Sequence, residues 1–359
     1  MTLLNKTRLT NQAPTTPVAA IRVPDGDNAE AELPRGPLAA ASRSHGRGSD
    51  LQSRRRRSGA LPLCQLMALL TLSALLSTQA LALEIVATAP SMGALVRELT
   101  GTDNGLAVLA EPDRDLHSLQ AKPSMIRALR DADLLVALGA DLESGWLPAA
   151  INSAANRRIQ PGQPGYFEAA AQVPLLDVGG PADRAGGDVH PVGNPHVDMD
   201  PRRMKQIADA LAERLALLDP SGAEHYRRNA TAFGDKVEAR MDGWQRQLDG
   251  AIGVVLYHRD AVYLLDRFNV ALLGTIEEVP GVPPSGSQLK QLANQLGNLQ
   301  GGDGIILFAP YQSPKAPRKL AAELGWPIWQ LPLQPPVNAD GDGWLRHIDR
   351  WVDAIANGG

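Results

Sequence analysis

The sequence predicts an α/β protein of two lobes, each with a mainly parallel sheet flanked by helices, joined by one long rigid linking helix. Short β-rich apolar runs alternate with helical patterns, which is typical of parallel sheets. The runs fall into two sets separated by roughly a hundred residues, and two well-marked helices lie between the sets. The expected strands are 84–88, 106–110 and 134–138 in the first set, and 253–257, 304–308 and 327–331 in the second.

The N-terminal part of the chain has the pattern of an export signal. Four arginines at 54–57 precede an apolar run over 61–76, and small residues follow at 80–82. The run is shorter than a transmembrane helix requires, and a proline and several polar residues interrupt it. We therefore expect 54–82 to be a signal peptide that is cleaved near Ala82. Residues 1–53, rich in Pro, Gly, Ser and Arg, are expected to be a disordered leader or the result of a start codon assigned too early.

The rest of the chain divides into an N-terminal lobe at 83–218, a linking helix at 219–250 and a C-terminal lobe at 251–359. Asp-Pro pairs at 200–201 and 219–220 mark two helix starts, because Asp can cap a helix and Pro suits its first turn. Apolar residues then recur at spacings of three and four. At 1.5 Å per residue the second helix is roughly 40 Å long, enough to cross both lobes.

Charge and cysteine content restrict what the chain can bind. Residues 1–82 carry ten Lys and Arg against five Asp and Glu, and removing that net +5 from the chain's −4 leaves −9 for the remainder. Such a charge argues against nucleic-acid binding. The single cysteine, Cys64, lies within the predicted signal. The exported chain therefore has no thiolate, and a metal must be held by imidazole and carboxylate.

Three of the seven histidines lie where α/β folds place ligands, in loops at the carboxyl ends of strands. His117 and His258 follow predicted strands, and His196 stands just before a helix start. Three imidazoles with a fourth oxygen ligand suit tetrahedral Zn²⁺. Asp115 or Asp198 could orient one of the rings from behind.

The other histidines downstream of the signal have different expectations. His225, off the apolar stripe of the linking helix, and His347, in a C-terminal helix, are predicted to be surface residues. His190 lies in a loop rich in Gly and Asp, from which it could relay an ion to the site.

Residues 194–201, Asn-Pro-His-Val-Asp-Met-Asp-Pro, resemble the Asn-Pro-His-x-Trp-x-Asp-Pro signature of the metal-binding substrate-binding proteins of bacterial zinc and manganese ABC transporters. Asp115-Leu-His117 and Tyr257-His258 are similar to two further segments of that family, and the resemblance covers residues 84–356. It implies a metal site between two α/β lobes, with His117 and His196 from the first lobe and His258 from the second.

The resemblance also implies a function. A periplasmic, monomeric protein is expected to capture Zn²⁺ and deliver it to an ABC permease at the inner membrane. Mn²⁺ is less expected, because three nitrogen ligands favour Zn²⁺. The family supplies a carboxylate from a loop after the last strands, so Asp340 is a candidate fourth ligand, with Asp342 or water as alternatives. The long acidic, histidine-rich loop of many zinc importers is missing, and a shorter segment over 179–190 takes its place.

Three other functions stay open at this point. A manganese-binding homologue or a metal-binding adhesin would share the same features. A zinc hydrolase, with Glu277 or Glu278 as a base, is less expected, because the sequence has neither a His-Glu-x-x-His helix nor a nucleophile elbow.

Overall fold

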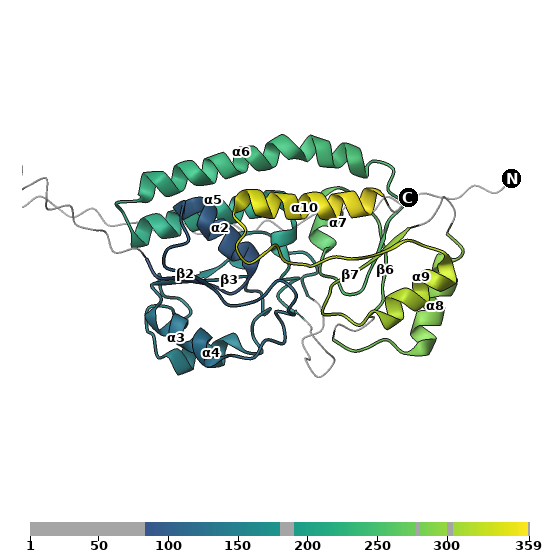
Figure 1. Cartoon of the computed structure of the whole chain (residues 1–359), viewed down its shortest axis with the longest axis horizontal. Coiled ribbons are helices and arrows are strands. Elements are labelled where there is room, and N and C mark those ends of the chain that lie inside the picture. Colours follow the sequence, from purple (N-terminus) through teal and green to yellow (C-terminus); the bar gives the residue numbers. More distant parts are fainter. Residues whose placement is uncertain (1–82, 180–189, 278–280, 300–303, 358–359) are drawn as a thin grey trace, which may run out of the picture. The chain divides into compact units, whose positions relative to one another are not determined.

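Two four-stranded parallel sheets form the framework of this protein, whose computed structural model describes residues 83–179, 190–277, 281–299 and 304–357 (Figure 1). The first sheet has the order β2-β1-β3-β4, from β1 Ile85–Ala87, β2 Leu106–Val108, β3 Leu134–Ala137 and β4 Tyr166–Glu168. The second has the equivalent order β6-β5-β7-β8, from β5 Val254–Leu256, β6 Leu272–Thr275, β7 Ile305–Phe308 and β8 Ile328–Gln330. The predicted fold class is confirmed, and the leader and signal expected at 1–82 lie outside the described residues.

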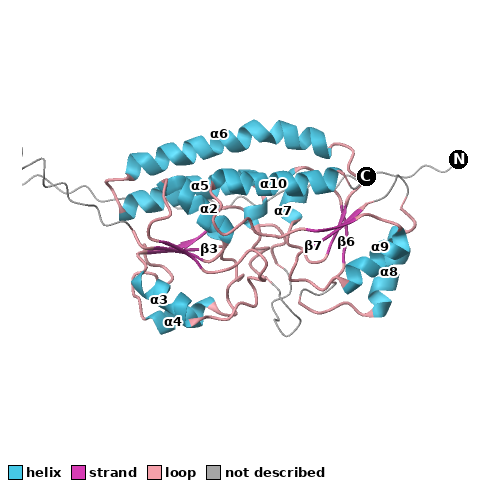
Figure 2. Ribbon diagram, in the orientation of Figure 1, coloured by secondary structure: helices cyan, strands magenta, loops and turns pink. Residues whose placement is uncertain are grey.

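The central strands are apolar at every position because helices cover both faces of each sheet. Successive side chains of a strand point to opposite faces. Ile85 and Ala87 accordingly join one core while Val86 joins another, and Val254 and Val255 divide in the same way. Figure 2 shows the helices on either side of the strands.

The helices follow the strands in the order expected for alternating α/β units. They are α2 Pro90–Thr100, α3 Pro123–Asp131, α4 Leu147–Ala154, α5 Pro201–Leu218, α6 Ala223–Leu248, α7 Val262–Arg267, α8 Gly286–Leu296, α9 Lys315–Leu324 and α10 Gly341–Ala356. Helices α3 and α4 contribute to the core on one face of the first sheet, and α8 and α9 to the core on one face of the second. A third, larger core contains residues of both sheets and of α2, α5, α6, α7 and α10. Within the described ranges, no helix has the length and apolar content needed to cross a bilayer.

Helix α6 connects the two sheets and has 26 residues, which corresponds to about 39 Å. It lies along α5 and α10 (Figure 1). The two Asp-Pro pairs differ in their effect. Asp200 caps α5 by accepting the Arg202 N–H, whereas α6 begins at Ala223 and Asp219 stabilises the preceding turn instead, by accepting hydrogen bonds from Ser221 and Tyr226.

The C-terminal helix α10 returns from the second sheet to pack against α2 and α6. This packing overturns the prediction that His347 is a surface residue. Its side chain is 1% exposed, and its Nε2 lies 3.0 Å from the Leu333 carbonyl oxygen. Burial lowers the pKa of His347 to about 4. The prediction was wrong because the loop that joins β8 to α10 folds back over that face of the helix and brings the Leu333 carbonyl to His347.

Candidate metal centre

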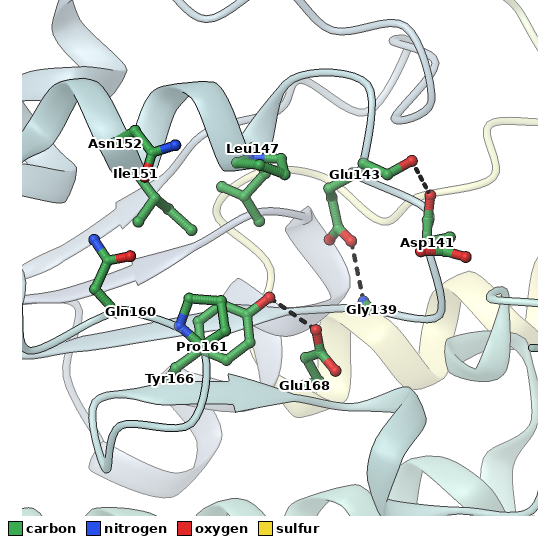
Figure 3. Close-up of a pocket in the computed structure, with 12 residues that line it drawn as sticks. Gly139, Asp141, Glu143, Leu147, Ile151, Asn152, Gln160, Pro161, Tyr166 and Glu168 are labelled. Carbon is green, nitrogen blue, oxygen red and sulfur yellow. Dashed lines mark hydrogen bonds between the residues drawn. The ribbon is translucent and has the colours of Figure 1, made fainter.

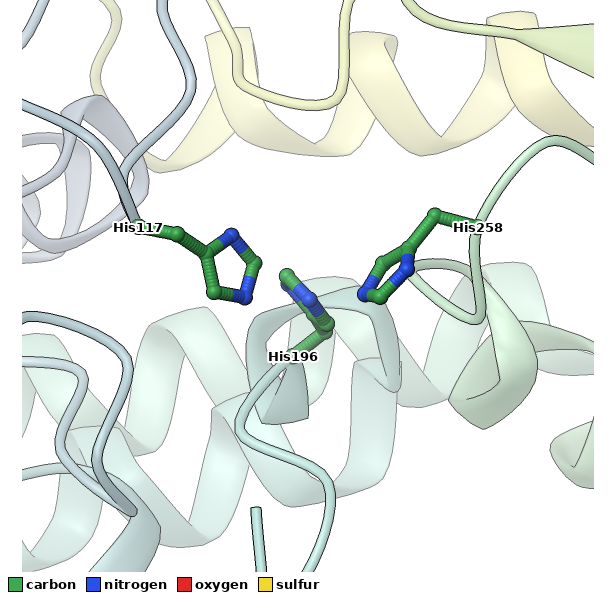
Figure 4. Close-up of side chains that lie close together, drawn as sticks. All are labelled: His117, His196 and His258. Atoms are coloured by element: carbon green, nitrogen blue, oxygen red, sulfur yellow. The ribbon is translucent and has the colours of Figure 1, made fainter. Parts of the chain in front are cut away.

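Three histidines from separate parts of the chain come together in the structure. His117, His196 and His258 each offer a ring nitrogen, and these atoms all lie within 4.8 Å of one another. Figure 4 shows the three rings turned toward a common point. Nitrogens bound to one tetrahedral zinc at 2.0–2.1 Å are about 3.3 Å apart, so the widest pair must approach by at most roughly 1.5 Å.

The Asn-Pro-His segment is fixed by its asparagine. The Asn194 side chain accepts the His196 N–H at 3.0 Å and donates to the Arg259 carbonyl at 2.7 Å. The Tyr263 hydroxyl donates to the Asn194 carbonyl at 2.6 Å. The turn that carries His196 is thereby tied to the residue that follows His258, and so the two imidazoles keep a defined separation.

A carboxylate lies behind each of the two outer histidines. Asp115 Oδ1 is 2.8 Å from Nδ1 of His117 and also accepts the His117 N–H at 2.9 Å. Glu277 Oε2 is 3.6 Å from Nδ1 of His258. The hydrogen bond to Asp115 fixes the His117 ring and its tautomer, and leaves its Nε2 to bind a metal. Glu277 is at ion-pair distance from His258 and does not fix that ring in the same way. Asp115 thus has the orienting place expected for it.

The same carboxylates set the electrostatics of the site. Burial acts to raise the pKa of Asp115, but its hydrogen bonds and charge interaction with His117 outweigh this effect and lower that pKa. For His258, burial acts to lower the pKa, while Glu277 and Asp260 outweigh it and raise the pKa. A metal must therefore compete with a proton at His258.

His196 is the innermost of the three. It is 1% exposed, and within the described part of the chain neither of its ring nitrogens has a hydrogen-bond partner. Burial, followed by the nearby imidazoles of His117, His258 and His190, lowers its pKa well below the usual value. Buried polar atoms are rarely left unpaired, because each costs about 1–3 kcal/mol. A neutral, unpaired imidazole facing two others has the properties of a preformed metal ligand.

His190 lies beside this group. Its Nε2 is 3.1 Å from Nε2 of His117, and the two ring centroids are 5.1 Å apart. Next to the histidines is a cavity of about 300 Å³ whose lining includes Asp115, His117, His258, Glu277 and Tyr311.

The carboxylates considered for a fourth ligand are engaged elsewhere. Asp340 caps α10 by accepting the Gly343 N–H at 2.8 Å, and Asp342 lies 3.3 Å from the Lys236 ammonium. Neither of them belongs to the group of three possible metal ligands found among the described residues, and His190 in its present position does not belong to it either. Asp198, 1% exposed, accepts a hydrogen bond from Gln334 at 2.8 Å rather than from an imidazole. Of the two glutamates considered as a base, Glu277 faces His258, and Glu278 lies outside the described residues.

A second cavity, of about 220 Å³, lies between α4, β4 and the turn after β3 in the first lobe (Figure 3). Its carboxylates have structural partners. Glu143 is 3% exposed and accepts hydrogen bonds from the Thr88 hydroxyl and from the N–H groups of Leu138 and Gly139, while Glu168 accepts one from Tyr166. The bonds of Glu143 hold the turn that ends β3, and the bond of Glu168 lies within β4, so both carboxylates stabilise the framework of the lobe.

Comparisons with known proteins identify the family of this chain. The family described as zinc-uptake complex component A, periplasmic, matches residues 85–358. The high-affinity zinc uptake system protein ZnuA of Paracoccus denitrificans is 26% identical over 295 residues, which cover 70% of this chain and 84% of that protein.

Solved structures share the fold. A zinc-bound deletion mutant of ZnuA matches with a TM-score of 0.63 and 22% identity, over 77% of this chain and 98% of that one. The substrate-binding protein FpvC of Pseudomonas aeruginosa, in complex with Mn²⁺, matches with a TM-score of 0.62 and 23% identity, over 77% and 97% of the two chains. Since the family match spans nearly all of the described residues, this chain belongs to the family of periplasmic A components of zinc-uptake complexes.

Proposed function

We propose that this protein captures Zn²⁺ with His117, His196 and His258 and delivers it to an ABC permease in the inner membrane. The single observation that carries the proposal is His196, a buried imidazole without a hydrogen-bond partner among the described residues. It faces His117, whose Nδ1 is hydrogen-bonded to Asp115, and His258, whose Nδ1 lies 3.6 Å from Glu277. Ligation of an ion gives the lone pair of His196 a partner and offsets the cost of its burial.

Zinc is the preferred cargo in this proposal. Imidazole nitrogens suit Zn²⁺, whereas Mn²⁺ prefers sites rich in oxygen. The ZnuA relative supports this choice by its name, and the Mn²⁺ complex of FpvC defines the metal that must be tested against it. Copper binds most imidazole sites more tightly in vitro, so availability also decides which metal is carried.

Export and transport complete the proposal. The chain enters the periplasm by a signal at 54–82, is cleaved near Ala82, works as a monomer and catalyses no reaction. Sequencing of the exported protein is expected to give an N-terminus near Leu83. Steady zinc-dependent hydrolysis of an ester or peptide panel would favour the hydrolase alternative instead.

Calorimetric titration of the purified protein tests metal capture. Wild type is expected to bind one Zn²⁺ per chain and to bind Mn²⁺ much more weakly. Each of H117A, H196A and H258A is expected to raise the Kd for Zn²⁺ by roughly a hundredfold or more, since even groups behind the ligands contribute about ten- to a hundredfold. H225A is the matched control, because His225 is an exposed histidine on α6. Absence of binding by wild type, or wild-type binding by the triple variant, would reject the proposal.

Delivery requires a cellular test. In a strain that lacks the chain, wild type is expected to restore growth under zinc limitation, whereas the triple histidine variant is expected not to, at equal protein levels. Full restoration of growth by the triple variant would show that zinc delivery does not depend on metal capture at this site, and would contradict the proposal.

A further inference from the structure

We infer that His190 supplies a fourth imidazole to the ion held by His117, His196 and His258, so that the loaded site binds Zn²⁺ through four nitrogens and no carboxylate. This inference rests on the proposed function, because it concerns the same ion. It replaces the carboxylate that the sequence suggested for the fourth position.

The separation of two ring nitrogens is the first argument. Nε2 of His190 lies 3.1 Å from Nε2 of His117. Two nitrogens bound to one tetrahedral zinc are about 3.3 Å apart, as follows from bonds of 2.0–2.1 Å. Because Asp115 holds Nδ1 of His117, the atom of His117 that His190 approaches is the one left to bind the metal. The two rings therefore already have nearly the spacing of neighbouring ligands.

The backbone around His190 holds it at this place. Two segments run side by side, joined by hydrogen bonds from the Gly179 N–H to the Pro191 carbonyl at 3.2 Å and from the Asn194 N–H to the Leu176 carbonyl at 2.8 Å. The Gly193 N–H donates to the His190 carbonyl at 3.0 Å and closes a turn between them. Because Asn194 also anchors His196, both histidines are fixed by one short stretch of chain.

Gly193 makes this turn possible. Its φ of +131° lies in a region that other residues rarely adopt, and a Cβ there would lie 2.6 Å from the Leu175 side chain. The close return of the chain that brings His190 to His117 therefore depends on a glycine at this position.

The contacts of the other candidates for the fourth position favour the same assignment. The predicted alternatives, Asp340 and Asp342, make contacts with Gly343 and Lys236 instead. For His190 to become a ligand, its ring must turn from His117 toward the ion.

Four neutral imidazoles leave the bound ion with its full charge of +2, balanced from behind by Asp115 and Glu277. Such a site favours Zn²⁺, Ni²⁺ and Cu²⁺, and disfavours Mn²⁺, which prefers oxygen ligands. His190 thus has a role in selectivity, and H190D is expected to narrow the gap between the affinities for Zn²⁺ and Mn²⁺.

The test places a spectroscopic label at position 190. Cobalt(II) is used in place of zinc, because a cysteine thiolate bound to it gives an intense near-ultraviolet charge-transfer band that imidazole does not give. The purified H190C variant with one equivalent of Co²⁺ is expected to show this band. Wild type is the baseline for the one native cysteine, Cys64. The H225C variant is the matched control and is expected to show no band, because His225 is exposed on α6 and contacts Asn229 of the same helix and the Thr100 carbonyl of α2.

Zinc titration of H190A completes the test. The Kd is expected to rise by roughly tenfold or more while one Zn²⁺ still binds, and the thermal unfolding of the metal-free protein checks that the variant is folded. Absence of the cobalt band in H190C, together with a wild-type Kd in H190A, would overturn the inference and leave the three-histidine proposal standing. Failure of wild type to bind zinc would instead overturn the proposed function itself.

Discussion

Replacing His196 by leucine separates metal binding from folding. Its ring is 1% exposed, and neither nitrogen has a partner within the described residues. An unpaired buried polar group costs about 1–3 kcal/mol. Leucine has a similar volume, and swaps that conserve volume in a core cost less than about 1.5 kcal/mol. In metal-free H196L the free energy of unfolding is therefore expected to rise by about 1 kcal/mol.

Without metal, H196L is expected to be more stable than wild type, and with saturating zinc wild type is expected to be the more stable of the two. A ligand at a thousand times its Kd stabilises the folded protein by about 4 kcal/mol. For a protein of this size 1 kcal/mol corresponds to about 2 °C in Tm. Wild type is expected to gain about 8 °C on saturation, while H196L starts about 2 °C higher without metal and gains nothing.

The assay is thermal unfolding followed by circular dichroism, with a chelator and then with excess Zn²⁺. H347L is the matched control, since His347 is equally buried but pairs with the Leu333 carbonyl. Its replacement leaves that oxygen unpaired and is expected to destabilise the protein by about 1–3 kcal/mol with no loss of zinc binding. If metal-free H196L were less stable than wild type by more than about 1 kcal/mol, or were still stabilised by zinc, the interpretation of His196 would be wrong.

Three further predictions concern Asp115, His347 and Asp200. D115N is expected to raise the Kd for Zn²⁺ by roughly ten- to a hundredfold by calorimetry, whereas D113N, at an exposed neighbour, is expected to leave it unchanged. Burial lowers the pKa of His347 to about 4, below the unfolded value of about 6.5, so the unfolded chain binds more protons between these values. The contribution of His347 to the free energy of unfolding, measured by urea denaturation, is therefore expected to fall by about 3 kcal/mol as the pH drops from 6.5 to 4. The H347Q variant is expected to lack this contribution to the pH dependence of stability. Asp200 is fully buried and pairs with Arg203 and Arg267, so D200A is expected to cost about 3–5 kcal/mol in chemical denaturation.

The sequence predicted the parts of the fold that depend on local pattern. Strands buried on both faces are apolar at each position, so β3 and β7 could be located from composition alone. Strand β4 was missed, because Tyr166–Glu168 is three residues long and mixed in character. Strand β6, Leu272–Thr275, was missed as well, since a glycine interrupts its apolar run.

The site was predictable to the extent that it follows strand ends and the Asn-Pro-His motif. His117 and His258 lie in loops that follow strands of the two sheets, and the sequence places both of them there. The place of His190 was not predictable in detail, because it depends on hydrogen bonds between segments 176–179 and 191–194. The burial of His347 likewise depends on the packing of α10 against α2 and α6 and on the loop before it. Propensity and spacing carry no information on such contacts.

The central claim is that three imidazoles distant in sequence share one ion, and diffraction at the zinc absorption edge tests it most directly. Crystals grown with one equivalent of Zn²⁺ are expected to give a single strong anomalous peak, about 2.1 Å from ring nitrogens of His117, His196 and His258. A zinc ion bound elsewhere, or one that is not ligated by all three of these side chains, would contradict the account.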